Sequence, residues 1–303
     1  MRSAVLIANP SAGQGGTRQR EEAIQRFCLL LKEQGIDVEV RPTRGPNDAT
    51  RLARDAANEG VRDVIVSGGD GTINEALQGL IGANVRLGIW PRGTANVLGR
   101  ELQLPRQVDR LADVIAAGTT RRIHAGCATV EGTGEKRYFL LMAGIGIDAA
   151  IVNRVRPALK KRVGEAAFWY SGLEHFARWQ PTAFVVEVDG EQYPATFAAI
   201  GKAPHYGGNL AITPRARMDR AEFEICLISS VQRLRFLKLL PFARFGGMPE
   251  GMKDVTFLRT AKARAIGDGV QAQVDGEVIG NLPMTFSISP HSIEVIVRDV
   301  PSA

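Results

Sequence analysis

Cysteine is scarce in this sequence and long apolar runs are missing, and each absence excludes a class of protein. The three cysteines, Cys28, Cys127 and Cys226, are odd in number and widely spaced, which fits neither a disulfide framework nor a metal site. The apolar run at the start is too short for a secretory signal. The longest later run, residues 139–147, falls well short of the roughly 20 apolar residues that a spanning helix needs. We therefore expect a soluble, reduced, intracellular chain.

The net charge is modest as well, and no basic tail is present. The formal net charge of +6 is dispersed along the chain. Such a charge suits phosphate-bearing partners or anionic lipid surfaces, although solubility is the simpler explanation of the charge alone. Zinc-ligand spacing and an aromatic RNA-binding signature are also missing, so we expect no nucleic-acid partner.

The length of 303 residues fits about two domains of roughly 150 residues each, and the 45% hydrophobic content is enough for a core in both. The first third alternates strand and helix patterns, which predicts a parallel sheet with helices on its faces. The expected strands are residues 4–8, 36–40, 64–66 and 87–89, and the expected helices are about residues 18–34 and 46–58.

Beyond about Gly118 the pattern changes to short alternating segments separated by turn residues. This sequence pattern predicts a mostly antiparallel β domain of the sandwich type. The expected strands are residues 184–188, 193–200, 223–228, 270–274, 284–288 and 293–297, and two helical stretches interrupt them at about 159–178 and 231–245.

Three glycine-bearing loops, residues 9–16, 67–72 and 91–96, follow strands of the first domain. In an open parallel sheet, ligands sit beyond the carboxyl ends of the strands, where these loops should lie. Glycine lets the backbone approach a phosphate closely, and the next helix offers unpaired N–H groups. We expect Thr72 and Thr94 to cap those helices and to offer hydroxyls to an anion.

Asp70 is the informative residue of the second loop. A carboxylate among phosphate-binding glycines would repel a nucleotide unless a cation lay between them, so Asp70 predicts Mg²⁺, bound directly or through water. The first loop alone is more often a plain turn. The chain also lacks the ordinary P-loop spacing, which makes this an unusual nucleotide site.

Six short sequence motifs follow one another along the chain. They are Asn9-Pro10-x-x-Gly13, Gly68-Gly69-Asp70-Gly71-Thr72-x-Asn74-Glu75, Pro91-x-Gly93-Thr94-x-Asn96, Ala143 to Ala149, Tyr206-Gly207-Gly208 and Val274-Asp275-Gly276-Glu277. In this order they resemble the diacylglycerol kinase catalytic family, which includes bacterial lipid kinases and sphingosine kinases. The second element is shared with NAD kinases and phosphofructokinases, and the later ones favour the lipid kinases.

The resemblance implies a nucleotide-binding α/β domain, Rossmann-like and spanning residues 1–125 with a returning segment at about 290–303. It also implies a β-rich acceptor domain over residues 126–289. The expected reaction transfers the γ-phosphate of ATP, with Mg²⁺, to a lipid hydroxyl, and diacylglycerol is the expected acceptor. Asp70 is implied as the magnesium-network acid and Asp275 as the general base, with Glu277 supporting the base or the metal. The implied nucleotide contacts are Asn9, Pro10, Ser11, Ala12, Gly13, Thr43, Ser67, Gly68, Gly69, Asp70, Gly71, Thr72, Asn74, Glu75, Gly93, Thr94 and Asn96.

The sequence Val-Asp-Gly-Glu occurs twice, at Val188 to Glu191 and at Val274 to Glu277. Asp-Gly between alternating segments is a strong hairpin-turn signal, so each copy alone reads as a plain turn. Spacing therefore cannot distinguish the two, and only the resemblance selects Asp275 over Asp189.

The chain also departs from the family pattern. Val97 replaces an acid after the third loop, and His124 stands where many relatives carry an acid; a satisfied polar core residue is the better interpretation of His124. A turn that often holds a structural Mg²⁺ reads Asp219-Arg220-Ala221 here. The arginine makes a second metal doubtful, and we assign none. These losses keep a catalytically weak nucleotide- or lipid-binding regulator as an alternative.

A mixed apolar and basic segment, residues 231–245, could lie on an anionic bilayer and admit a lipid, and a core helix with a solvated basic edge explains it equally well. Residues 160–162 form a second basic cluster, more simply a solvated helix start. The expected location is the cytoplasm at the inner membrane face. Another lipid, or a soluble acceptor such as NAD, remains an alternative substrate. The oligomeric state is open, with a homodimer as one option.

Overall fold

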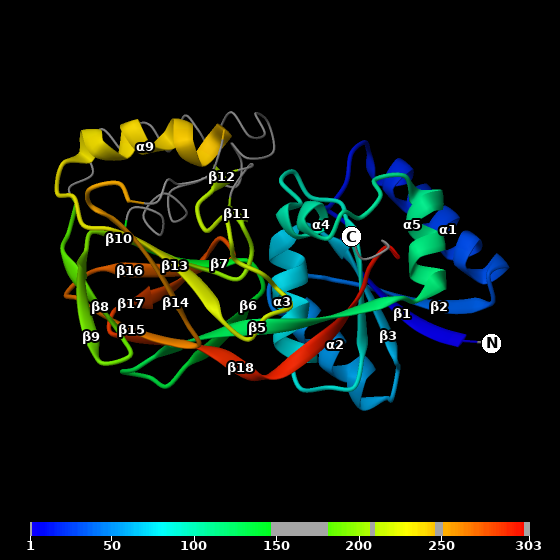
Figure 1. Cartoon of the computed structure of the whole chain (residues 1–303). Coiled ribbons are helices and arrows are strands. Elements are labelled where there is room, and N and C mark those ends of the chain that lie inside the picture. Colours follow the sequence, from blue (N-terminus) through cyan, green and yellow to red (C-terminus); the bar gives the residue numbers. More distant parts are fainter. Residues whose placement is uncertain (1, 147–180, 207–209, 246–250, 300–303) are drawn as a thin grey trace. The chain divides into compact units, whose positions relative to one another are not determined.

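The computed structural model describes residues 2–146, 181–206, 210–245 and 251–299 (Figure 1). The chain divides into two compact units, residues 1–123 with 291–303 and residues 124–290. Strands β5 (Thr120–Val130) and β18 (Met284–Ile296) each begin in one unit and end in the other. The helix expected at about 159–178 and the basic cluster at 160–162 lie outside the described residues.

Unit 1 contains a parallel sheet in the order β2-β1-β3-β4. The end of β18 joins this sheet, because Glu294 and Val295 pair in parallel with β4. All six residues of β3 are buried, as expected for a parallel strand covered on both faces. The predicted parallel α/β architecture is confirmed. The strands are β1 (Arg2–Ala8), β2 (Ile36–Pro42), β3 (Asp63–Gly68) and β4 (Arg86–Pro91).

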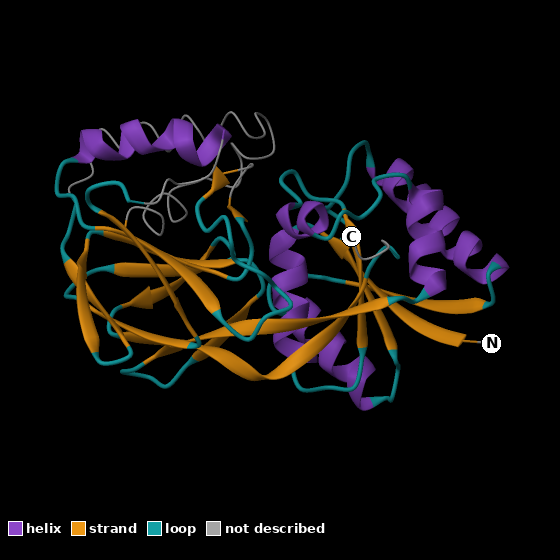
Figure 2. Ribbon diagram, viewed as in Figure 1, coloured by secondary structure: helices purple, strands orange, loops and turns teal. Residues whose placement is uncertain are grey.

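The helices of unit 1 form two pairs, in which α1 packs against α5 and α2 against α3. Figure 2 shows the pairs on opposite faces of the sheet. Each helix turns a buried apolar stripe inward, for example Phe27 and Leu31 in α1. The helices are α1 (Thr17–Glu33), α2 (Asp48–Asn58), α3 (Asp70–Leu80), α4 (Val97–Glu101) and α5 (Val108–Ala117).

Unit 2 is built from antiparallel strands, as predicted. One sheet has the order β14-β13-β10-β7-β16-β17, and β18, β15, β8 and β9 pair in a second. Its core draws side chains from both sheets, with Phe139 stacked on Phe223 at 5.8 Å between ring centroids. The remaining strands are β6 (Lys136–Phe139), β7 (Met142–Gly146), β8 (Phe184–Val188), β9 (Glu191–Ala195), β10 (Phe197–Gly201), β11 (His205–Tyr206), β12 (Leu210–Ala211), β13 (Phe223–Ile228), β14 (Val255–Thr260), β15 (Lys262–Ile266), β16 (Gln271–Val274) and β17 (Glu277–Asn281).

Two strand boundaries differ from the prediction. The segment expected at 193–200 divides at Thr196, whose backbone N–H and hydroxyl both donate to the carbonyl of Ile228, so the chain changes partner from β8 to β13. The segments expected at 284–288 and 293–297 form one 13-residue strand, β18.

Helix α9 (Arg233–Phe245) covers the segment that the sequence left ambiguous. Phe236, Leu239 and Ala243 are buried at helical spacing, and the ring of Phe236 meets that of Phe197 edge-on. One face of the helix therefore packs on the protein, whereas Phe242 is 43% exposed. No helix of the described residues is both long and apolar enough to cross a bilayer.

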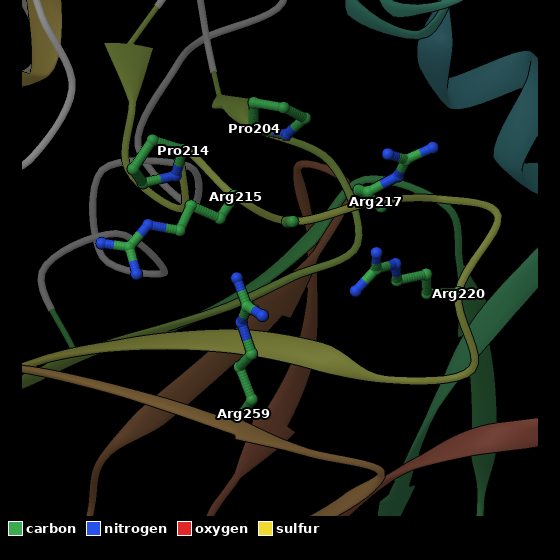
Figure 3. A pocket seen from close by; sticks show the side chains of 7 residues that line it. Pro204, Pro214, Arg215, Arg217, Arg220 and Arg259 are labelled. Atoms are coloured by element: carbon green, nitrogen blue, oxygen red, sulfur yellow. The ribbon is translucent and has the colours of Figure 1, made fainter.

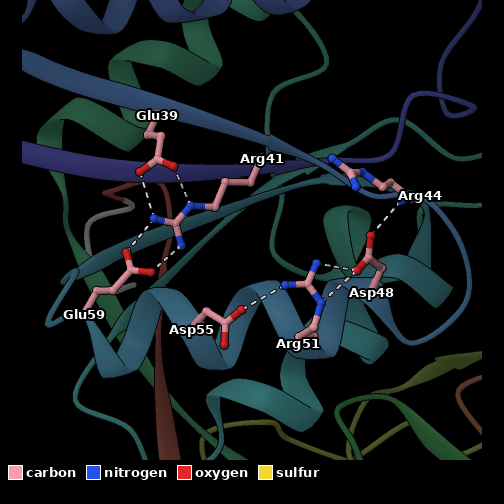
Figure 4. Close-up of polar contacts among 7 residues, drawn as sticks. All are labelled: Glu39, Arg41, Arg44, Asp48, Arg51, Asp55 and Glu59. Carbon is pink, nitrogen blue, oxygen red and sulfur yellow. Dashed lines mark hydrogen bonds and ion pairs between the residues drawn. The ribbon is translucent and has the colours of Figure 1, made fainter.

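Ion pairs form on the surface of β2 and α2 (Figure 4). Arg41 bonds to both Glu39 and Glu59, and Arg51 bonds to Asp48 and Asp55. The Arg51 guanidinium and the backbone N–H of Arg44 lower the pKa of Asp48. Solvent screens such pairs, so each adds little to the stability of the fold.

The buried acid Asp63 is a different case. Its carboxylate is fully buried and is held by Arg86 through two hydrogen bonds, Nε to Oδ1 at 2.6 Å and Nη2 to Oδ2 at 2.8 Å. The Arg2 guanidinium adds an ion pair at 2.7 Å and donates to the carbonyls of Ile115 and Ala116. This cluster joins the starts of β1, β3 and β4 to the end of α5.

Removing the buried acid should therefore cost far more than removing an exposed one. We expect Asp63→Ala to lower the free energy of unfolding by about 3–5 kcal/mol, because two arginines lose their shared counter-charge. Asp55→Ala, which removes an exposed partner of Arg51, should change it by no more than about 0.5 kcal/mol. Urea unfolding of both variants measures the difference, and equal effects would contradict this account.

Candidate functional site

The three glycine-bearing loops meet at the carboxyl ends of β1, β3 and β4. The backbone N–H of Asn9 donates to the carbonyl of Ser67 at 2.9 Å, and that of Arg92 donates to the carbonyl of Gly68 at 2.7 Å. The Asn9 side chain donates to the Thr72 hydroxyl at 3.0 Å. The loops predicted to share a site therefore do lie together in unit 1.

Glycine is required where the second and third loops touch. A Cβ atom on Gly93 would lie 2.6 Å from the Cα of Gly69, too close for any side chain. Gly13 in the first loop has φ +101°, and a Cβ there would lie 2.5 Å from the Arg92 guanidinium. These positions keep the surface of the loops formed by backbone, which suits close approach by a phosphate.

Asp70 is the first residue of α3, and its carboxylate reaches the start of α4. Oδ2 accepts the N–H of Val97 and Oδ1 accepts the N–H of Leu98, both at 3.1 Å. The acid therefore binds two of the unpaired N–H groups at that helix terminus. The carboxylate thus has partners within the protein, and the magnesium role of Asp70 stays a prediction.

The donor set around Asp70 fits magnesium only in part. The described residues contain no group of three or more His, Cys, Asp or Glu side chains close enough to hold a metal ion. Mg²⁺ is commonly bound by one or two carboxylates together with water and substrate phosphates. Each Asp70 oxygen has a lone pair beyond its single N–H bond, so the residues fit a metal that the nucleotide helps to hold.

The expected capping roles of Thr72 and Thr94 are wrong. Gly69 is the cap residue of α3, and Thr72 lies in the first turn with its hydroxyl accepting from Asn9. The cap position of α4 is Asn96, and Thr94 is exposed before it. The Asn96 side chain instead shapes the third loop, since it accepts the N–H of Gly93 at 2.7 Å and donates to its carbonyl at 2.8 Å.

Most other predicted nucleotide contacts line the same loops. In the first loop, Asn9 Oδ1 accepts the N–H of Ser11 and the Asn9 carbonyl accepts that of Ala12, which fixes the turn around Pro10. Thr43 lies at the end of β2 and donates its N–H to the carbonyl of Ala8. Gly71 follows Asp70 in α3 and is exposed.

Two predicted contacts lie deeper in α3. Asn74 is buried, and its side-chain and backbone oxygens both accept from Gln78. Glu75 is half-buried, and its carbonyl accepts the hydroxyl of Thr50 from α2. These hydrogen bonds of Asn74 therefore lie within α3, and that of Glu75 joins α3 to α2.

Arg92 was missed by the sequence argument, which treated its position as variable. Its guanidinium lies over the Trp90 ring at 4.8 Å and next to Gly13, so it bridges the first and third loops. Burial and the charge of Arg20 lower its pKa. Among the described residues, neither Arg92 Nη1 nor the buried Ser67 hydroxyl has a hydrogen-bond partner. Both are donors that a phosphate oxygen would satisfy.

Asp275 occupies a hairpin turn in unit 2 with φ +46°. Its Oδ1 accepts the N–H groups of Leu141 and Met142 at 3.0 and 2.9 Å, and its Oδ2 accepts that of Leu140 at 2.9 Å. Its own N–H donates to the carbonyl of Met142. The turn is therefore bound to the segment between β6 and β7.

Asp189, in the other copy of the sequence, has the same backbone conformation and different contacts. Its φ is +51°, and it is exposed. Thr260 lies 3.5 Å from its carboxylate. The two turns therefore differ in tertiary contacts and not in local geometry. Glu277 is exposed and forms an ion pair with Arg137.

The turn at residues 219–221 contains a buried cation supplied by the chain. Lys202 is fully buried, and its ammonium donates to the carbonyls of Arg217 at 3.2 Å, of Arg220, and of Glu222 at 3.0 Å. Burial lowers the pKa of Lys202 to about 8, and Asp219 and Glu222 oppose this shift. His124 is half-buried beside this loop and donates its backbone N–H to the carbonyl of Met218.

Comparison with known proteins matches both units. Residues 3–128 match the diacylglycerol kinase catalytic domain, and residues 142–297 match the YegS C-terminal NAD kinase beta sandwich-like domain. The chain is 30% identical to a diacylglycerol kinase of Mycobacterium tuberculosis, over 96% of this chain and 93% of that one. It is 28% identical to a diacylglycerol kinase of Bacillus subtilis, over 98% and 97%.

A solved structure supports the fold. The crystal structure of a diacylglycerol kinase from Bacillus anthracis str. Sterne superposes with a TM-score of 0.75 at 20% identity, covering 98% of this chain and 97% of that one.

The buried ammonium leads to a prediction about stability and pH. Lys202→Met should lower the free energy of unfolding by about 3 kcal/mol at pH 7, because buried carbonyls lose their donor. The folded-state pKa of about 8 is below the ordinary 10.5, so unfolding takes up a proton between these values. The advantage of the wild type over Lys202→Met should therefore increase as the pH rises from 8 to 10.5.

Urea unfolding across this pH range measures the difference. Lys262→Met is the control, because Lys262 is an exposed lysine of the same unit and its effect should stay flat with pH. If the advantage of the wild type over Lys202→Met instead shrinks as the pH rises, the carbonyls raise the pKa of Lys202 by more than burial lowers it.

Proposed function

Because the chain belongs to the diacylglycerol kinase family, and is thus a kinase with an alcohol acceptor, we propose that it transfers the γ-phosphate of ATP to a lipid hydroxyl with the help of Mg²⁺. Diacylglycerol is the acceptor that the relatives' names favour. The meeting of three backbone-lined loops at one end of the unit 1 sheet is the observation that carries the nucleotide half of the proposal.

The proposed nucleotide domain is residues 1–125 with the returning segment from about 290, and it contains the three glycine-bearing loops of unit 1. Phosphate oxygens would accept from the loop N–H groups and from the two buried donors, Arg92 Nη1 and Ser67 Oγ. A guanidinium that already bridges the first and third loops would hold the phosphates in one orientation, which is most of what phosphoryl transfer requires of a protein.

Asp70 is the proposed anchor for the metal. Mg²⁺, when bound with the nucleotide, would neutralise charge on the β- and γ-phosphates. The bonds from Val97 and Leu98 hold the carboxylate still and leave lone pairs for a metal-bound water. Asp70 would thus serve both as a cap of α4 and as part of the magnesium network.

Asp275 is the proposed general base, and it lies in the proposed acceptor domain of residues 126–289. Three backbone N–H groups fix the orientation of its carboxylate. We propose that this oriented carboxylate takes the proton of the acceptor hydroxyl. The ion pair between Glu277 and Arg137 would keep the turn in place.

The lipid acceptor implies work at a membrane surface, and we propose transient contact from the cytoplasmic side. Helix α9 supports this, because it carries the exposed ring of Phe242 together with the exposed cations Lys238 and Arg244. Exposed apolar groups beside cations suit an anionic bilayer.

The two copies of Val-Asp-Gly-Glu provide a matched test of the base. Asp275→Asn should lower kcat by about 10²–10⁴-fold, because the carboxamide cannot take the proton. Asp189→Asn, in a turn of the same backbone conformation, should leave kcat within about twofold, since no bond to a distant N–H is lost. The assay is transfer of labelled γ-phosphate into a lipid extract and, separately, into soluble alcohols including NAD.

Urea unfolding of the Asp275→Asn variant separates loss of the base from loss of folding, since Asp275 also binds the backbone of residues 140–142. Equal turnover in both variants would remove Asp275 from the mechanism. ATP binding by the wild type without transfer to any acceptor would favour the regulator alternative.

The magnesium role of Asp70 requires its own test. Asp70→Asn keeps one oxygen for the N–H bonds of α4, so the protein should still fold. We expect its affinity for ATP to fall by about tenfold or more with Mg²⁺ present and to change little without Mg²⁺. Titration calorimetry with and without EDTA measures both, and unchanged Mg²⁺-dependent binding would leave Asp70 as a structural cap alone.

A further inference from the structure

Unit 2 contains a pocket whose lining is dominated by arginine. It has a volume of about 510 Å³ and is lined by Pro204, Pro214, Ala216 and the four arginines Arg215, Arg217, Arg220 and Arg259 (Figure 3). No acidic residue is among these described lining residues. Three of the arginines come from the loop between β12 and β13, and Arg259 comes from β14.

The loop that carries three of these arginines is held rigidly from inside. The buried ammonium of Lys202 binds the carbonyls of Arg217, Arg220 and Glu222. The buried carboxylate of Glu224 accepts the backbone N–H of Arg215 at 2.6 Å. The backbone under each arginine is thus fixed, which lowers the entropy lost when the side chains bind a ligand.

Two of the arginines have acidic neighbours that are not among the lining residues of the pocket. Asp219 forms a two-bond ion pair with Arg217, and Glu222 lies 3.5 Å from Arg220. The structure shows no acid paired with the Arg259 guanidinium among the described residues. The described lining residues themselves carry four guanidinium groups and no carboxylate, and like charges gathered in one concavity repel unless an anion joins them.

We propose that this pocket binds a phosphate-bearing anion. The guanidinium fork matches the spacing of two phosphate oxygens and stays charged at any physiological pH. The site lies wholly in unit 2 and uses none of the glycine-bearing loops, so it stands whether or not the proposed kinase activity is correct. The same chemistry would suit the headgroup of an anionic phospholipid or a soluble phosphate ester.

The test compares two double variants that remove equal charge. Arg215→Ala with Arg259→Ala removes two pocket arginines and leaves both ion pairs of the loop intact. Arg106→Ala with Arg110→Ala removes two exposed arginines of unit 1 and is the matched control. Calorimetry with pyrophosphate should show a site that is weakened about tenfold or more in the first variant only.

A residue-resolved measurement excludes binding elsewhere on the protein. Phenylglyoxal modifies accessible arginines, and mass spectrometry locates the modified residues. Pyrophosphate should slow modification of Arg215 and Arg259 in the wild type and leave Arg106 and Arg110 unprotected.

Binding to lipid vesicles then distinguishes a lipid headgroup from a soluble phosphate ester as the ligand. Sedimentation with phosphatidylcholine vesicles, with and without phosphatidic acid, should show acid-dependent binding that the pocket variant loses if the ligand is a lipid headgroup. Loss of pyrophosphate binding with unchanged vesicle binding would assign the pocket to a soluble ester. Equal pyrophosphate affinity in both double variants, with no protection of Arg215 and Arg259, would overturn the proposal.

Discussion

Hydrogen bonds between single charged side chains and the backbone of distant segments hold the loops on which both candidate sites depend. Asp70 accepts two N–H groups from the start of α4, and Asp275 accepts three from the segment between β6 and β7. Lys202 is a donor and not an acceptor, and its ammonium donates to three backbone carbonyls. Charge-assisted bonds of this kind are stronger than neutral ones, so one side chain can fix a loop that has no regular secondary structure.

This interaction also explains why structure and chemistry share residues here. A carboxylate that is oriented by backbone donors is already in position for a metal-bound water or an acceptor hydroxyl, and little reorganisation is needed when a substrate arrives. The same bonds mean that a substitution of Asp70 or Asp275 changes folding and chemistry together. Only paired controls can separate the two effects.

The sequence predicted the elements of the fold well, because strand and helix patterns are local. It predicted β1 to β4, α1 and α2 within a few residues and located part of the antiparallel strands of unit 2, whereas strands such as β14, β15 and β17 were not predicted. It failed where the choice of partner is made far along the chain, as at Thr196, where pairing passes from β8 to β13. It also gave no indication of the hydrogen bonds of Asp70, whose partners lie 27 and 28 residues away. Asp189 and Asp275 were indistinguishable in sequence because their turns are locally alike, and Arg92 gave no signal because its stacking on Trp90 is visible only in the folded loops.

The buried lysine has a consequence for how this protein is handled. A cation that belongs to a side chain is covalently attached, so it can be neither removed by a chelator nor exchanged for another ion in the medium. The loop of residues 217–222 therefore keeps this side chain as its partner through purification, dialysis and changes of metal supply. Any sensitivity of this protein to EDTA consequently reports on some other part of the molecule.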